Sequence, residues 1–146
     1  MREVKIFTKI SYGGNRKKSM YGACIEFITS KGKAATGYYY GELLENVGFN
    51  QVILVALVTA LSHLTTPCHV TAYVQSNYVE NMLNNGYVKA WEKNGWKTAR
   101  GEPVACVEQW QQLMELLNVH TVVFASAYDN EYTQEMDKSL KEKRSS

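Results

Sequence analysis

Several features that would assign a protein to a class at once are missing from this chain. Its three cysteines are odd in number and widely spaced, which fits neither a disulfide framework nor a Cys-x-x-Cys zinc site. The longest apolar run, Val52 to Leu61, is too short to cross a bilayer, and no apolar stretch follows the charged residues at the start. We therefore expect a soluble, cytoplasmic protein with reduced thiols and no membrane contact.

Strong charge of one sign is also lacking. The formal net charge of +2 over 146 residues is too small to predict nucleic-acid binding by itself. Its distribution is uneven, because residues 1–79 hold eight Lys and Arg against four acids. The chain has no phosphate-binding loop and no evident nucleophile–base pair, and its histidines show no metal-ligand spacing. These absences favour a binding role over nucleophilic chemistry.

Hydrophobic periodicity and turn residues predict ten elements. Alternating apolar positions and aromatic or β-branched runs predict strands at 4–8, 21–29, 33–40, 70–74 and 121–125. Longer periodic segments predict helices at 50–64, 77–83, 88–93, 104–117 and 130–143. This order predicts one α/β domain over 1–146, with three antiparallel strands followed by two parallel ones in a mixed five-stranded sheet. We expect helices on both faces of the sheet and a disordered tail at 141–146.

Short motifs recur in a fixed order along the chain. They are Ile6-Phe7-Thr8, Tyr21-Gly22-Ala23, Ala60-Leu61, Cys68-His69-Val70, Trp91-x-x-x-Gly95-Trp96-Lys97-Thr98-Ala99, Pro103-Val104 and Trp110-Gln111. In order and spacing these motifs resemble the ribonuclease H family, in particular bacterial ribonuclease HI. The resemblance covers residues 4 to about 140 and implies a ribonuclease H-like fold.

The resemblance also implies four clustered carboxylates that hold two divalent cations and cut the RNA strand of an RNA–DNA hybrid. The matching positions here hold Lys9, Ile53, Gln75 and Gln134. A shifted register would place Asn50 or Gln51 at the second position instead, and neither is acidic. We therefore expect no metal, no cofactor and no enzymatic activity, as in a pseudoenzyme.

Lys9 has two possible roles at such a site. Its ammonium could occupy the place of a cation and bind the side-chain carbonyls of Gln75 and Gln134, with Ile53 filling the remaining volume. Alternatively, Lys9 simply extends its ammonium into solvent from the end of the sheet.

Cationic and aromatic side chains gather in two segments that resemble the hybrid-binding edges of the family. The residues are Asn15, Arg16, Lys17, Lys18, Trp91, Trp96, Lys97 and Arg100. Such mixtures contact phosphates and stack on bases or sugars, so we expect a non-catalytic module that binds RNA–DNA hybrid or duplex RNA. The alternative interpretation of the tryptophans is that they pack in the core.

A protein-interaction module is the second hypothesis. In it the chain is a regulator, an inhibitor or an assembly subunit, of phage or mobile-element origin, that keeps only the fold. The run Tyr38-Tyr39-Tyr40 would then offer an exposed aromatic patch to a protein partner or a second copy. The sequence does not determine the oligomeric state.

Overall fold

Five strands form one mixed sheet in the computed structural model, which describes residues 1–14 and 16–145. The strands are β1 (Arg2–Ser11), β2 (Ser19–Ile28), β3 (Ala34–Leu43), β4 (Cys68–Val74) and β5 (Thr121–Ser126). Their spatial order is β3-β2-β1-β4-β5. β1 to β3 pair antiparallel, whereas β4 is parallel to both β1 and β5. The predicted mixed sheet is confirmed.

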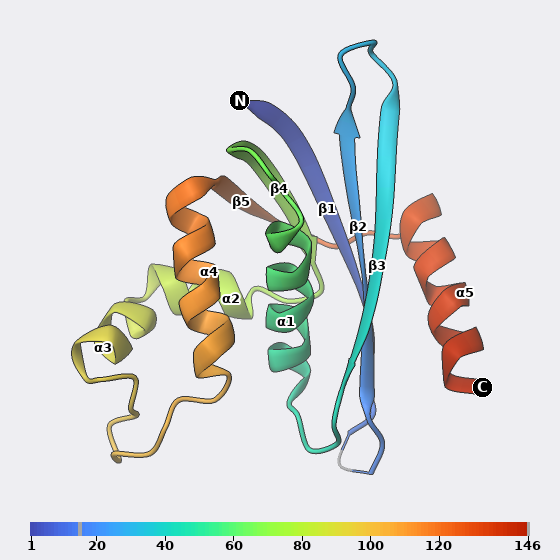
Figure 1. Cartoon of the computed structure of the whole chain (residues 1–146). Helices are drawn as coiled ribbons and strands as arrows, with labels where there is room; N and C mark the ends of the chain where they lie inside the picture. Colours follow the sequence, from blue (N-terminus) through green and yellow to red (C-terminus); the bar gives the residue numbers. More distant parts are fainter. Residues whose placement is uncertain (15, 146) are drawn as a thin grey trace.

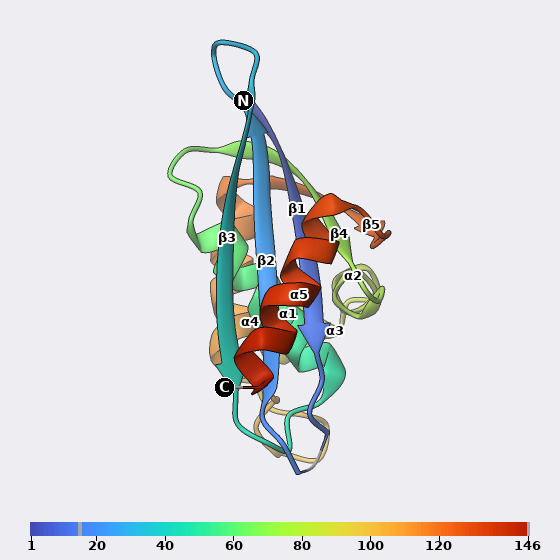
Figure 2. The same cartoon turned by 90° about the vertical axis from the view of Figure 1, so that its right-hand side faces the viewer.

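Within the described residues, five helices cover the two faces of this sheet unequally. They are α1 (Phe49–Ser62), α2 (Tyr78–Asn84), α3 (Tyr87–Lys93), α4 (Val107–Val119) and α5 (Glu131–Ser145). Figure 1 shows α1 to α4 on one side of the sheet and α5 alone on the other, and Figure 2 shows α5 lying across β1 and β2. The expected helices on both faces are therefore present.

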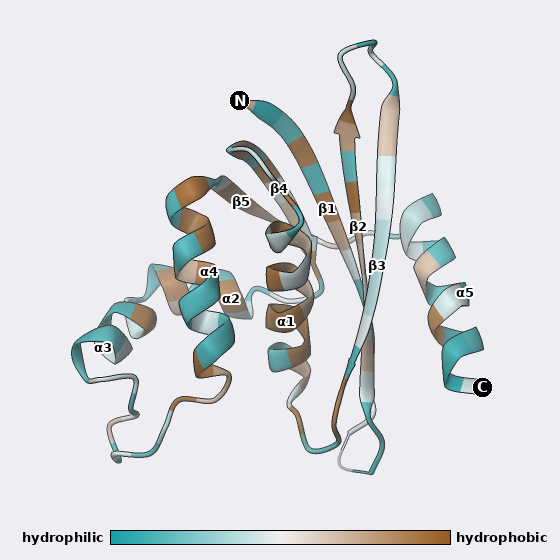
Figure 3. Cartoon of the chain, in the orientation of Figure 1, coloured by the Kyte–Doolittle hydropathy of each residue, from teal (hydrophilic) through white to brown (hydrophobic). Residues whose placement is uncertain are grey.

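The main core lies between the sheet and α1. Ile6 and Ala23 from the strands and Leu54, Leu57 and Leu61 from α1 are completely buried. α1 is apolar on nearly every side, and brown bands mark its hydrophobic residues in Figure 3. Such a helix needs to be enclosed, and α1 packs between the sheet and α4. None of the described helices is long and apolar enough to span a membrane.

A smaller core lies under α5. Phe7, Cys24 and Met136 are buried there, and tyrosines from β3, β4 and α5 pack around them. Burial raises the pKa of the Cys24 thiol to about 12, so this cysteine is a neutral packing group. α5 is therefore held by one continuous set of aromatic and sulfur contacts.

Residues 141–145 of the expected disordered tail are helical, and Ser146 lies outside the described residues. Residues 141–145 continue α5, and Arg144 makes three hydrogen bonds to residues at the two ends of the turn between β1 and β2. Its guanidinium donates to the Ser11 hydroxyl, the Ser11 carbonyl and the Lys18 carbonyl, at 2.9, 2.9 and 3.0 Å. The many charged residues of the segment favoured a solvated tail. However, a guanidinium can donate hydrogen bonds to backbone carbonyls as well as to carboxylates, and Arg144 does so here.

Candidate nucleic-acid interface

The carboxyl ends of β1 and β4 are joined by one pair of side chains. Backbone pairing of these strands ends at Phe7 and Tyr73. Beyond it, the buried Thr8 hydroxyl donates to Gln75 Oε1 at 2.7 Å, and Gln75 Nε2 donates to the Thr8 carbonyl. The Gln75 amide is thus engaged by Thr8, which differs from the hypothesis that its carbonyl accepts a hydrogen bond from Lys9.

The other positions of the expected carboxylate cluster differ in exposure. Ile53 is completely buried in α1, and Gln134 is exposed on α5. Asn50, in the first turn of α1, accepts a hydrogen bond from the Ser76 hydroxyl at 3.0 Å, directly after Gln75 in the chain. Of the residues considered for the second position, Asn50 therefore has a side-chain contact at the strand ends.

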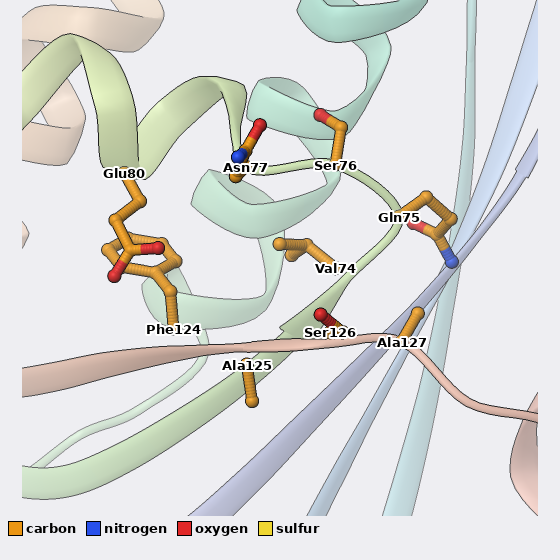
Figure 4. A pocket seen from close by; sticks show the side chains of 9 residues that line it. All are labelled: Val74, Gln75, Ser76, Asn77, Glu80, Phe124, Ala125, Ser126 and Ala127. Atoms are coloured by element: carbon orange, nitrogen blue, oxygen red, sulfur yellow. The ribbon is translucent and has the colours of Figure 1, made fainter.

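Two hollows open where β4 and β5 end. The first measures about 350 Å³ and is lined by residues 74–77, 124–127 and Glu80, as Figure 4 shows. The second measures about 380 Å³ and is lined by Lys9, Gln75, Ala127, Tyr128, Asp129 and Thr133. Gln75 and Ala127 line both hollows, so the Thr8–Gln75 link lies beside the boundary between them.

The second hollow does not fit the two divalent cations that the resemblance implies. Among its lining residues Asp129 is the one carboxylate, and the Lys9 ammonium would repel a cation. The described part of the chain contains no group of three or more His, Cys, Asp or Glu side chains that could hold a metal ion.

The start of α5 fixes Asp129 beside this hollow. Asn130 and Thr133 cap the helix reciprocally, because each side-chain oxygen accepts the other residue's backbone N–H at 2.9 Å. The Thr133 hydroxyl also lies 3.3 Å from an oxygen of Asp129. One turn further, a hydrogen bond from Lys141 lowers the pKa of Asp137, and the charge of Lys9 adds a smaller effect of the same sign.

The turn between β1 and β2 carries the first group of predicted contact residues. Arg16 and Lys17 are exposed and, with Arg144, line a hollow of about 650 Å³. Lys18 is exposed too, but its ammonium pairs with Glu42 at 2.9 Å. Asn15 lies outside the described residues. The sequence interpretation missed Arg144, because no periodic signal links position 144 to a turn more than one hundred residues earlier.

Close packing holds the base of this turn in place. The Gly13 backbone N–H donates to the Ser19 hydroxyl at 2.9 Å. A Cβ at position 13 would overlap the carbonyl oxygens of Lys17 and Lys18, so the turn needs glycine there. With the three Arg144 bonds, these contacts fix where Arg16 and Lys17 emerge.

The second group lies on the loop after α3. Lys97 and Arg100 are exposed there, and a short bridge between Lys97 and Pro103 closes the loop. The loop is tied further by the Thr98 N–H, which donates to the Glu102 carbonyl at 2.7 Å. Figures 1 and 2 both place this loop at the same end of the molecule as the β1–β2 turn.

The tryptophans of this region pack inward. Trp91 meets the buried Trp110 edge-on with ring centroids 5.6 Å apart, and Trp96 packs against the main core. An exposed aromatic pair lies elsewhere: Tyr12 and Phe49 meet edge-on at 5.7 Å and are 48% and 36% exposed. This pair lies beside the β1–β2 turn, because Tyr12 also lines the hollow of Arg16 and Lys17.

The strand order β3-β2-β1-β4-β5 in a mixed sheet defines the ribonuclease H class of folds, and this protein has that fold. A family model for RNase H matches residues 1–128. A ribonuclease H of Chlorobium phaeobacteroides is 34% identical over 139 residues, which cover 93% of this chain and 91% of the relative. The chain therefore belongs to the ribonuclease H family.

Solved structures agree on the fold. LC9-RNase H1, a type 1 RNase H, superposes with a TM-score of 0.72 at 17% identity over 94% of this chain and 70% of its own. A foamy viral protease-reverse transcriptase in complex with RNA/DNA hybrid gives a TM-score of 0.59 at 14% identity, over 94% of this chain and 18% of that one.

The family relationship corrects one expectation. We expected the chain not to be an enzyme, because four positions lack the acids that the resemblance implies. The curated relatives contradict this expectation, since proteins about one-third identical over most of the chain are named as an enzyme, ribonuclease H.

Proposed function

We propose that this ribonuclease H family protein binds RNA–DNA hybrid at the end of the molecule formed by the β1–β2 turn and the loop after α3. The observation that carries the proposal is that the β1–β2 turn and the loop after α3 lie at one end of the molecule. The turn carries Arg16 and Lys17, and the loop carries Lys97 and Arg100. Two separated groups of cations suit a duplex, because each can contact the phosphates of one strand. Lys18 contributes less, since Glu42 neutralises it.

The exposed Tyr12–Phe49 pair supplies the aromatic surface in this proposal. Trp91 and Trp96 support the loop from inside, whereas Tyr12 and Phe49 present ring faces and edges to a ligand. Aromatic rings beside cations pack on sugars and bases, and the 2′-hydroxyl distinguishes an RNA strand from DNA. The foamy viral protease-reverse transcriptase with the same fold was solved in complex with RNA/DNA hybrid, which supports this choice of ligand.

The protein-interaction alternative has less support. Tyr38 and Tyr40 pack around the small core beneath α5, and Tyr39 stacks on His63 with ring centroids 3.6 Å apart. The tyrosine run is therefore engaged within the chain and offers little surface to a partner.

The test is fluorescence anisotropy with matched RNA–DNA hybrid, duplex RNA and duplex DNA over a salt series. We expect the hybrid to bind most tightly and the affinity to fall as salt rises. The double variant Arg16→Gln, Lys17→Gln should weaken binding and reduce the slope of log K against log salt by about two. Cleavage is followed in the same samples with Mg²⁺ and Mn²⁺.

A matched control is available at the opposite end of the molecule. Lys31→Gln, Lys33→Gln removes the same charge from the turn between β2 and β3, which Figures 1 and 2 place far from the β1–β2 turn. This control should bind as the unmodified protein does. Equal losses in both double variants, or no hybrid binding at low salt, would contradict the proposal.

A further inference from the structure

Lys9 lies at the end of β1 on the face that α5 covers. Side chains alternate along a strand, so Lys9 shares this face with Phe7, which packs in the small core under α5. The Phe7 ring stacks on Tyr73 at 4.8 Å and meets Tyr128 edge-on at 5.9 Å. Beyond this aromatic group, the half-buried Lys9 side chain lines the 380 Å³ hollow at the strand ends.

The Lys9 ammonium has no ion-pair partner within the described part of the chain. Two acids near Lys9 are engaged by other groups. Asp137 pairs with Lys141 at 2.9 Å, and its pKa is lowered by the hydrogen bond from Lys141 and slightly by the Lys9 charge. Asp129, at the same hollow as Lys9, lies 3.3 Å from the Thr133 hydroxyl. The Gln75 amide is occupied by Thr8 on both its oxygen and its nitrogen. The hollow thus presents an ammonium whose hydrogen-bonding capacity is unused.

We propose that the Lys9 ammonium binds a backbone phosphate of the nucleic acid in this hollow, so that binding at the strand ends needs no divalent cation. The inference rests on the proposed function, because the phosphate belongs to the hybrid bound there. It follows from the misfit described above: a cation-binding site would need several carboxylates, whereas this hollow offers one ammonium and one carboxylate. A lysine serves as a compact point charge with three donors for a phosphate oxygen.

The neighbouring groups define how strong this contact is. The half-exposed Tyr128 side chain lines the same hollow and carries a neutral hydroxyl. The carboxylates of Asp129 and Asp137 oppose an incoming anion and reduce the net gain. One charge-assisted hydrogen bond with such opposition corresponds to roughly a tenfold change in affinity.

The experiment compares Lys9→Gln with Lys5→Gln in the anisotropy assay. Lys5 is exposed, points to the same face of β1 as Lys9 and lies about 13 Å earlier along the strand. The Lys5→Gln substitution therefore removes the same charge at a position away from the hollow. Lys9→Gln should weaken hybrid binding about tenfold and lower the salt slope by about one, with Lys5→Gln near the unmodified protein. Lys9→Arg should retain most of the affinity.

The same titrations are repeated in EDTA and in millimolar Mg²⁺ at matched ionic strength. Equal affinity of the unmodified protein in both conditions supports the inference, whereas binding that requires Mg²⁺ overturns it. An unchanged affinity or salt slope for Lys9→Gln also overturns it and leaves hybrid binding intact. If the unmodified protein itself fails to bind hybrid, the proposed function fails instead, so the two failures are distinguishable.

Discussion

Replacing Arg144 with alanine should loosen the contact between α5 and the β1–β2 turn. The substitution removes three hydrogen bonds, to two oxygens of Ser11 and one of Lys18. Each such bond contributes about 0.5–1.5 kcal/mol net, and the half-exposed site lets water replace part of the loss. We therefore expect a loss of about 1–2 kcal/mol in the free energy of unfolding, or roughly 3–7 °C in Tm.

Urea denaturation followed by tryptophan fluorescence measures this change, with Lys138→Ala on the exposed side of α5 as the control. The effect should persist at high salt, because the acceptor atoms are neutral oxygens and not carboxylates. Amide hydrogen exchange in the β1–β2 turn should also accelerate in the Arg144 variant. Equal urea midpoints for the two variants would refute the reasoning and restore the expectation of a disordered tail.

Two further predictions concern stability. Gly41→Ala should cost about 1–3 kcal/mol by urea denaturation, because the new methyl group would overlap the buried Tyr21 ring; an unchanged midpoint would show that the ring can move freely. Burial lowers the pKa of His120, whose Nδ1 accepts the Cys68 N–H at 3.1 Å, so the unfolded state binds more protons. Stability should therefore fall as pH drops below about 6.5, by at most about 1.4 kcal/mol per pH unit, and His120→Asn should reduce this pH dependence.

The sheet and helices were predictable because their signals are local. Alternation in β1 and the nearly all-round apolar surface of α1 appear within one stretch of sequence, and the structure confirms both elements. The order of these elements along the chain, with short connections between them, then predicted the mixed sheet. Exact ends were harder to predict: β1 extends to Ser11 because β2 pairs with it as far as Met20.

The candidate site was only partly predictable because its contacts are distant in sequence. The Thr8–Gln75 pair spans 67 positions and the Arg144–Ser11 pair 133, and no periodic pattern marks either one. The inward packing of Trp91 depends on Trp110 in another helix. Residue type alone could therefore predict Arg16 and Lys17 as contact residues, but it could not predict which residues fix the position of their turn.

The unequal cover of the sheet has a consequence for biosynthesis. The five strands of the described residues precede α5 in the chain, so the ribosome synthesises them before it makes the helix that shields the second face. Until then, Phe7, Tyr73 and the tyrosines of β3 form an open aromatic surface. A nascent chain paused before α5 would be open to self-association and to capture by chaperones during that interval.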